Sequence, residues 1–185
     1  MSVAPVVRTY LELDDPAVLR PAAPPRLSGV EIVPVQPPDG AVNRWFYVEV
    51  GRAHAWTDHL FRSAEQWQAW AEGAETWMAT VDGARAGYYE LRRVPGSAEL
   101  AYFGLLPAFQ GAGLGGWLLT HALRRALALE PRVWLHTCTL DGPHALANYR
   151  ARGLRAYRTE TLPGRLRTSP RGARAASSCR PRPAR

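Results

Sequence analysis

The amino-acid sequence predicts one mixed α+β domain over residues 1–161. Segments that alternate apolar and polar residues, as strands do, are interspersed with segments whose apolar residues recur at helical spacing. Asp82-Gly83 lies between two such strand-like runs and is a hairpin signal, so antiparallel strands are expected before the first long helix. A length of 185 residues suits one domain with a core and is too short for two ordinary domains with a linker.

The first part of the chain is rich in proline. Short strands are expected at residues 8–13 and 30–35, with a proline-rich connector between them. Residues 1–40 are therefore interpreted as an N-terminal extension of the domain that contributes short strands.

A helix is expected at residues 63–72. Ser63 and Gln66 have the spacing of a capping box, in which each side chain bonds to the backbone amide of the other residue. Trp67 and Trp70 follow at helical spacing, which extends the predicted helix beyond its first turn.

The rest of the domain alternates strands and helices. Pro131 ends a long helical pattern, Asp141 is suited to cap the next helix, and Gly153 marks its end. The expected elements are strands at 76–81, 87–94 and 99–106, a helix at 113–129, a strand at 133–139, a helix between 141 and 153, and a strand at 154–161.

Charge is distributed unevenly along the chain. All 23 basic residues are Arg, and the 16 acidic residues all lie at or before Glu160. Residues 162–185 hold seven Arg and four Pro residues and few large apolar ones, a composition that predicts a disordered basic tail. A contact of this tail with RNA or an acidic partner is the alternative, and no other part of the chain indicates nucleic-acid binding.

Targeting and metal signals are lacking in the sequence. There is no apolar run of 18 residues and no signal peptide, so a cytoplasmic protein without membrane contact is expected. Cys138 and Cys179 are too few for a disulfide framework and are interpreted as thiols. The five histidines show no ligand spacing, so no metal is expected.

Residues 110–116, Gln-Gly-Ala-Gly-Leu-Gly-Gly, form the most informative segment. Glycines between a strand and a helix let backbone N–H groups turn toward a phosphate at the positive end of the helix dipole. A dinucleotide loop is excluded because it follows the first strand and needs an acid about 20 residues later. A nucleotide P-loop is excluded because the chain has no Lys. A tight turn without a ligand is the remaining alternative.

Gln110, Gly113 and Gly115 match in register the pyrophosphate loop of the Gcn5-related N-acetyltransferase (GNAT) superfamily, which the chain resembles from about residue 76 to 161. The resemblance implies an α/β sandwich with a mostly antiparallel central sheet and helices on both faces. It also implies acetyl-CoA as co-substrate. The implied coenzyme-binding residues are Leu105, Gln110, Gly111, Ala112, Gly113, Leu114 and Gly115.

The resemblance also suggests two catalytic residues. Glu99 lies eleven residues before Gln110, the spacing of the acid in histone-type members, and a carboxylate can take the proton of an amine directly or through water. Tyr149 matches the family tyrosine that supplies a proton or a hydrogen bond to the departing thiolate. An ordinary strand carboxylate and a core tyrosine are the alternatives for the two residues.

The chain departs from the family pattern at one helix. Members often carry Asn seven residues before the tyrosine, where this sequence has Gly142. Asn148 is not counted as a substitute, because adjacent residues on a helix point in different directions. His136 and Cys138 are expected to share one face of a strand, which leaves an acyl-cysteine route open beside direct transfer.

The acceptor site is expected in the aromatic segment at residues 44–59. Aromatic rings and carboxylates bind a cationic amine well. The predicted substrate-binding residues are Tyr47, Glu49, Trp56 and Asp58. Packing of two helices on the sheet, with solvated acids, is the alternative.

Together these patterns predict an acetyl-CoA-dependent N-acetyltransferase that acts on a small amine in a ternary complex. A peptide or protein N-terminal acetyltransferase is one alternative. A non-catalytic acyl-CoA-binding module with an Arg-rich interaction tail is the other. A monomer or a homodimer is compatible with the sequence.

Overall fold

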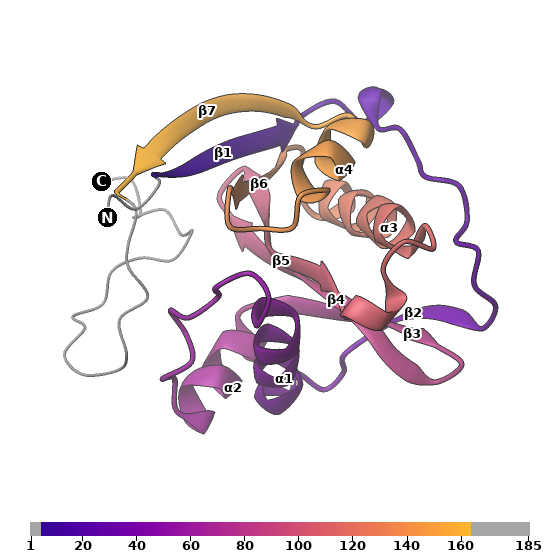
Figure 1. Ribbon diagram of the computed structural model, residues 1–185, viewed down its shortest axis with the longest axis vertical. Helices are drawn as coiled ribbons and strands as arrows, with labels where there is room; N and C mark the ends of the chain where they lie inside the picture. Colours follow the sequence, from indigo (N-terminus) through magenta and orange to yellow (C-terminus); the bar gives the residue numbers. More distant parts are fainter. Residues whose placement is uncertain (1–4, 164–185) are drawn as a thin grey trace.

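The computed structural model describes residues 5–163, which build a seven-stranded sheet between two layers of helices (Figure 1). The strand order is β2-β3-β4-β5-β6-β1-β7, and every neighbouring pair is antiparallel except β5 and β6. The strands are β1 (Val6–Leu13), β2 (Val30–Pro34), β3 (Glu75–Val81), β4 (Ala84–Val94), β5 (Ser97–Leu105), β6 (Val133–Cys138) and β7 (Arg155–Leu162). The expected tail beyond residue 163, with Cys179, lies outside the described residues.

The helices cover both faces of this sheet, which confirms the predicted α+β class. Helices α1 (Gly40–Gly51) and α2 (Ala64–Glu72) lie on one face, and α3 (Leu114–Leu129) and α4 (Ala145–Ala151) lie on the other (Figure 1). Two short 3-10 turns, η1 (Pro16–Val18) and η2 (Pro107–Phe109), lie in the connections.

The local signals in the sequence match the observed elements. Asp82 and Gly83 have φ angles of 48° and 79°, and two left-handed residues are what a tight hairpin turn requires. The Ser63 hydroxyl accepts from the Gln66 amide at 3.2 Å, while the Gln66 side chain accepts from the Ser63 amide at 2.9 Å. The capping box at the start of α2 is therefore confirmed.

Helix α1 is not one of the expected elements, although helices packed on the sheet are the alternative given for residues 44–59. Asp39 caps it, with Oδ1 accepting from the amides of Ala41 at 2.8 Å and Val42 at 3.3 Å. Phe46 is fully buried, and its ring is stacked on that of Tyr88 at 4.7 Å between centroids. The signal that was missed is an N-cap Asp followed by apolar residues four apart.

Asp141 does not cap α4, contrary to the prediction. That helix begins only at Ala145, with His144 at the N-cap position and no side-chain cap bond. The Asp141 carboxylate accepts instead from the Thr137 hydroxyl at 2.6 Å and the Cys138 amide at 2.9 Å. The end of β6 offers these donors directly, because the chain turns back over it before the helix starts.

A buried polar cluster joins α1 and α2 to the sheet. Glu90 on β4 has no exposed surface and accepts hydrogen bonds from the Asn43 amide at 2.8 Å and the Trp70 indole at 2.5 Å. Asn43 also donates to the Thr76 hydroxyl at 2.7 Å. Since buried polar groups are costly unless they are paired, this cluster fixes the position of both helices over the sheet.

The N-terminal strand lies inside the sheet rather than at its edge. Strand β1 pairs with β6 on one side and with β7 on the other. Leu11 and Leu13 have 0% and 1% of their surface exposed and belong to the main core. The segment that the sequence described as an extension therefore completes the sheet.

Truncation of Leu11 tests this role of β1. Leu11→Ala is expected to lower the free energy of unfolding by about 2 to 5 kcal/mol, because it leaves a cavity in a fully buried site. Denaturant titration followed by circular dichroism measures the effect. Leu60→Ala, at a leucine that is 40% exposed, is the matched control and should change stability by less than about 0.5 kcal/mol. Equal effects of the two variants would contradict a structural role of β1.

Candidate active site

A cavity opens where two parallel strands separate. β5 and β6 pair only at Ala98 with Val133 and at Glu99 with Trp134, and the strands diverge beyond these residues. The cavity has a volume of about 760 Å³ and lies in the resulting gap. It is lined by β5, by glycines of residues 110–116, by the end of β6, by residues 140–145, by α4, and by the end of α1 with the turn that follows.

The glycine loop, residues 110–116, lies at one end of this cavity. Gly111 and Gly113 have φ angles of 83° and 87°, in the left-handed region that favours glycine. Gly113 is the N-cap of α3 and provides no side-chain cap bond, which leaves the amides of the first turn available to a ligand. The glycine loop therefore lies at the positive end of a 16-residue helix, the arrangement that a phosphate cradle requires.

Most, but not all, of the predicted coenzyme residues line the cavity. Leu105, Gln110, Gly111, Gly113 and Gly115 do, and Gly116 joins them. The side-chain amide of Gln110 donates to the Leu105 carbonyl at 3.3 Å, and this bond holds the loop against the end of β5. Two predicted residues stay outside the lining, because the Leu114 side chain is fully buried in the core and the Ala112 carbonyl accepts from the Arg26 amide at 2.8 Å.

Tyr149 reaches the cavity from α4. Its side chain is only 7% exposed, and its ring meets that of Phe103 edge to face at 6.1 Å between centroids. Burial first, and then the negative charge of Asp141, raise the pKa of Tyr149 well above its usual value. Within residues 5–163 its hydroxyl has no hydrogen-bond partner, so it is free to bond to a ligand.

An aromatic wall closes the opposite side of the cavity. It consists of Tyr47 on α1, Trp56 in the following turn, and Tyr102 on β5, with ring centroids 5.3 to 5.6 Å apart. Burial raises the pKa of Tyr47 to about 12, and its hydroxyl accepts from the His59 amide at 3.2 Å. Two of the predicted substrate residues, Tyr47 and Trp56, therefore lie in the cavity.

The three predicted acids do not line it. Glu99 is buried at the start of β5, with its carboxylate 3.7 Å from Arg92 Nη1. Glu49 pairs with Arg52 at 2.8 Å on the outer side of α1. Asp58 lies in the loop beyond the aromatic wall, and it is also absent from the lining.

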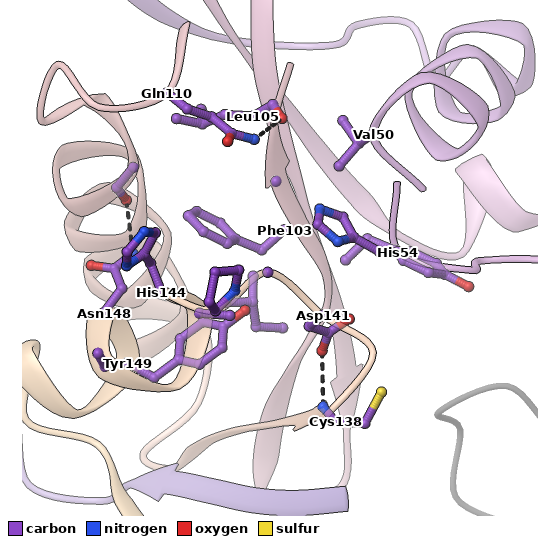
Figure 2. Close-up of a pocket in the computed structure, with 18 of the residues that line it drawn as sticks. Val50, His54, Phe103, Leu105, Gln110, Cys138, Asp141, His144, Asn148 and Tyr149 are labelled. Atoms are coloured by element: carbon purple, nitrogen blue, oxygen red, sulfur yellow. Dashed lines mark hydrogen bonds between the residues drawn. The ribbon is translucent and has the colours of Figure 1, made fainter. Parts of the chain in front are cut away.

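The structure brings three further polar residues to the cavity. Figure 2 shows His54 on one side, Asn148 on the other beside Tyr149, and Asp141 close to Cys138. Asn148 donates to the Gly115 carbonyl at 3.4 Å, and both it and Tyr149 line the cavity, although adjacent residues on a helix were expected to point in different directions. Asp141 accepts from the Trp56 indole at 3.5 Å. None of the three was predicted, since their meeting depends on the packing of distant segments.

Histidine and cysteine on β6 also line this space. His136 and Cys138 share one face of the strand, as their spacing predicted. Among the residues that the structure describes, no group of three or more His, Cys, Asp or Glu could hold a metal ion. In the same part of the chain, no helix has the length and apolar character needed to cross a bilayer.

Comparison with known proteins agrees with this geometry. The chain matches the model of the acetyltransferase (GNAT) family over residues 41–154. No curated protein matches it in sequence.

Several solved structures share the fold. A GCN5-related N-acetyltransferase from Sphaerobacter thermophilus is 15% identical, with a TM-score of 0.65, over 86% of this chain and 51% of that one. A GCN5-related N-acetyltransferase from Kribbella flavida is 19% identical, with a TM-score of 0.60, over 86% and 57%. A tandem GNAT protein from the clavulanic acid biosynthesis pathway is 23% identical, with a TM-score of 0.58, over 87% and 53%. The chain thus spans little more than half the length of these proteins.

The family match covers the whole stretch from α1 to the end of α4, and it includes the glycine loop, the diverging strands and Tyr149. The structural neighbours reproduce the fold that surrounds these parts. The protein belongs to the GNAT family of acetyltransferases.

Proposed function

We propose that this protein transfers an acetyl group from acetyl-CoA to the nitrogen of a small amine, by direct attack in a ternary complex. The observation that carries the proposal is the single cavity between β5 and β6, which extends from the glycine loop to the aromatic wall. A donor and an acceptor bound at its two ends would meet in the gap between the strands. Such positioning is itself a large part of catalysis.

The residues of the donor side fit a coenzyme A pyrophosphate. Backbone amides of the first turn of α3 are not capped by a side chain, and a Cβ at Gly111 would meet no atom within 4 Å. This open, positively polarised cradle suits a phosphate group. When bound there, acetyl-CoA supplies a thioester carbonyl carbon, and the end of β5 offers backbone groups alongside it.

Tyr149 has the properties of a hydrogen-bond donor to the leaving group. A buried hydroxyl with a raised pKa keeps its proton at neutral pH and can donate a hydrogen bond to the departing sulfur. Glu99 stays a prediction as the base, because its carboxylate is paired with Arg92 and lies outside the cavity lining.

The acceptor side favours an amine that carries no acid group. The lining contains aromatic rings and the carboxylate of Asp141, but none of the Arg side chains of the described residues. An acceptor carboxylate would lose its hydration without gaining a cationic partner, which costs several kcal/mol.

A matched pair of substrates tests this preference. We expect kcat/KM for 2-phenylethylamine to exceed that for phenylalanine by at least ~100-fold, since the two differ only in the carboxylate. Phenylalanine amide resembles a peptide N-terminus and lacks the carboxylate charge. Its rate therefore tests the alternative of a peptide acceptor. A faster reaction with the amide than with the amine would favour a peptide acceptor. Equal rates for the amine and the amino acid would contradict the charge argument.

The proposal as a whole is tested with the full chain, acetyl-CoA and a panel of amines. Release of the CoA thiol and formation of the acetylated amine, measured by mass spectrometry, should agree in amount. If acetyl-CoA binds but no amine is acetylated, the protein is a non-catalytic acyl-CoA-binding module.

A further inference from the structure

His54 lies at the acceptor end of the cavity, near the aromatic wall. It belongs to the turn after α1, where its backbone amide donates to the Gly51 carbonyl at 2.9 Å. The side chain is half-buried, and its imidazole points into the cavity (Figure 2). Within the described part of the chain, neither ring nitrogen has a hydrogen-bond partner.

The position of this imidazole depends on the glycine at position 142. A Cβ built on Gly142 would lie 3.4 Å from His54 Cε1 and 4.0 Å from its Nε2. The ring thus packs against the bare backbone of the loop that joins β6 to α4. A larger residue at position 142 would push the imidazole out of this place.

The surroundings of His54 are aromatic, and one carboxylate lies in the same cavity lining. Its ring lies 6.5 Å from that of Trp56, whose indole donates to Asp141. The Asp141 carboxylate is fixed by two further donors, and it is the only carboxylate among the residues that line the cavity. The other titratable side chains in the lining are Tyr47, Tyr102, His136, Cys138, His144 and Tyr149.

We propose that His54 is the proton acceptor for the amine, a role that rests on the proposed acetyl transfer. The neutral amine nitrogen forms a bond to the acetyl carbonyl carbon while the carbon–sulfur bond breaks and its electron pair stays on sulfur. One amine proton passes to the His54 imidazole, while the Tyr149 hydroxyl donates a hydrogen bond to the sulfur. The proton then passes from the imidazolium through solvent to the thiolate, so that the CoA thiol forms and the imidazole is restored.

Tyr149 and His54 lie on opposite sides of the cavity. Tyr149 belongs to α4 on the donor side, whereas His54 belongs to the α1 side, next to the aromatic wall. His144 lies on the Tyr149 side beside Asn148, away from the expected acceptor (Figure 2). Histidine is also the side chain that ordinarily exchanges protons near neutral pH, which suits a general base.

The test compares His54→Gln with the wild-type full chain over a range of pH. We expect kcat to fall by about 100-fold and the acidic limb of the kcat/KM profile to disappear, while the Kd for acetyl-CoA stays within about twofold. His121→Gln is the matched control, because His121 bonds to Tyr89 on the α3 side, outside the cavity lining, and its loss should preserve rate and profile.

Chemical rescue separates a proton-transfer role from a structural one. His54→Ala leaves a space in the cavity wall. Added imidazole should raise the kcat of this variant at least about tenfold, in a concentration-dependent way. Gly142→Val, which keeps the histidine but displaces it, should lower kcat without being rescued.

The outcomes distinguish this inference from the function on which it rests. If the wild type acetylates an amine and His54→Gln keeps its acidic limb, or if Glu99→Gln or His144→Gln loses that limb instead, the role of His54 is overturned and the acetyltransferase remains. If the wild type acetylates no amine, the proposed function fails and the inference fails with it.

Discussion

Replacement of Gly113 by Asp should strongly weaken acetyl-CoA binding. Gly113 has a φ angle of 87° at the N-cap of α3, where the proposed pyrophosphate contacts backbone amides. A carboxylate there fills the cradle and repels phosphate, so we expect the Kd to rise at least ~100-fold, or about 2.7 kcal/mol. Isothermal titration calorimetry measures the loss directly.

Gly96→Asp is the control for the strain and charge of that substitution. Gly96 has a φ angle of 75°, no atom lies within 4 Å of a Cβ built on it, and it sits in the turn between β4 and β5, outside the cavity lining. Both variants should lose about 1 kcal/mol of stability to the left-handed conformation. If Gly113→Asp binds acetyl-CoA as well as Gly96→Asp does, the loop is a turn and not a phosphate cradle.

Tyr149→Phe should lower kcat by about 100-fold while acetyl-CoA binding is preserved. The substitution removes only the hydroxyl that is aimed into the cavity. Because burial raises the pKa of Tyr149, the hydroxyl keeps its proton between about pH 6 and pH 9, and wild-type kcat should show no decline at alkaline pH from this group. Steady-state kinetics at several pH values measure both effects.

Tyr89→Phe is the matched control for this second variant. Tyr89 is also a buried tyrosine with a pKa raised by burial, but its hydroxyl bonds to His121 Nδ1 at 2.8 Å, away from the cavity. The free energy of unfolding of Tyr89→Phe should be about 1 kcal/mol lower than that of the wild type, and its kcat should be unchanged. A similar loss of kcat in both variants would assign the effect of Tyr149→Phe to packing.

Local signals in the sequence were sufficient for most elements. The capping box at Ser63, the Asp82-Gly83 hairpin and the glycine loop each depend on a few neighbouring residues, so the sequence carries the complete information. The same holds for Gln110, Gly113 and Tyr149, whose spacing is set by one loop and one helix.

The remaining parts depend on contacts between distant segments. The position of β1 between β6 and β7 follows from long-range pairing, which no local pattern encodes. Asp141 has the residue type and spacing of a helix cap, but donors at the end of β6 compete for its carboxylate. His54 and Asp141 are 87 residues apart and meet at one cavity only after folding. Glu49 and Asp58 were assigned to the acceptor site by residue type alone. Whether an acidic side chain faces the cavity depends on the folded structure, and neither of the two lines it.

We propose above all that the gap between β5 and β6 binds an acyl-CoA thioester. Calorimetric titration of acetyl-CoA into the wild-type full chain tests it most directly. We expect one site with a Kd on the order of micromolar and competition by CoA. The absence of binding heat at two temperatures, in a protein shown to be folded by circular dichroism, would contradict it.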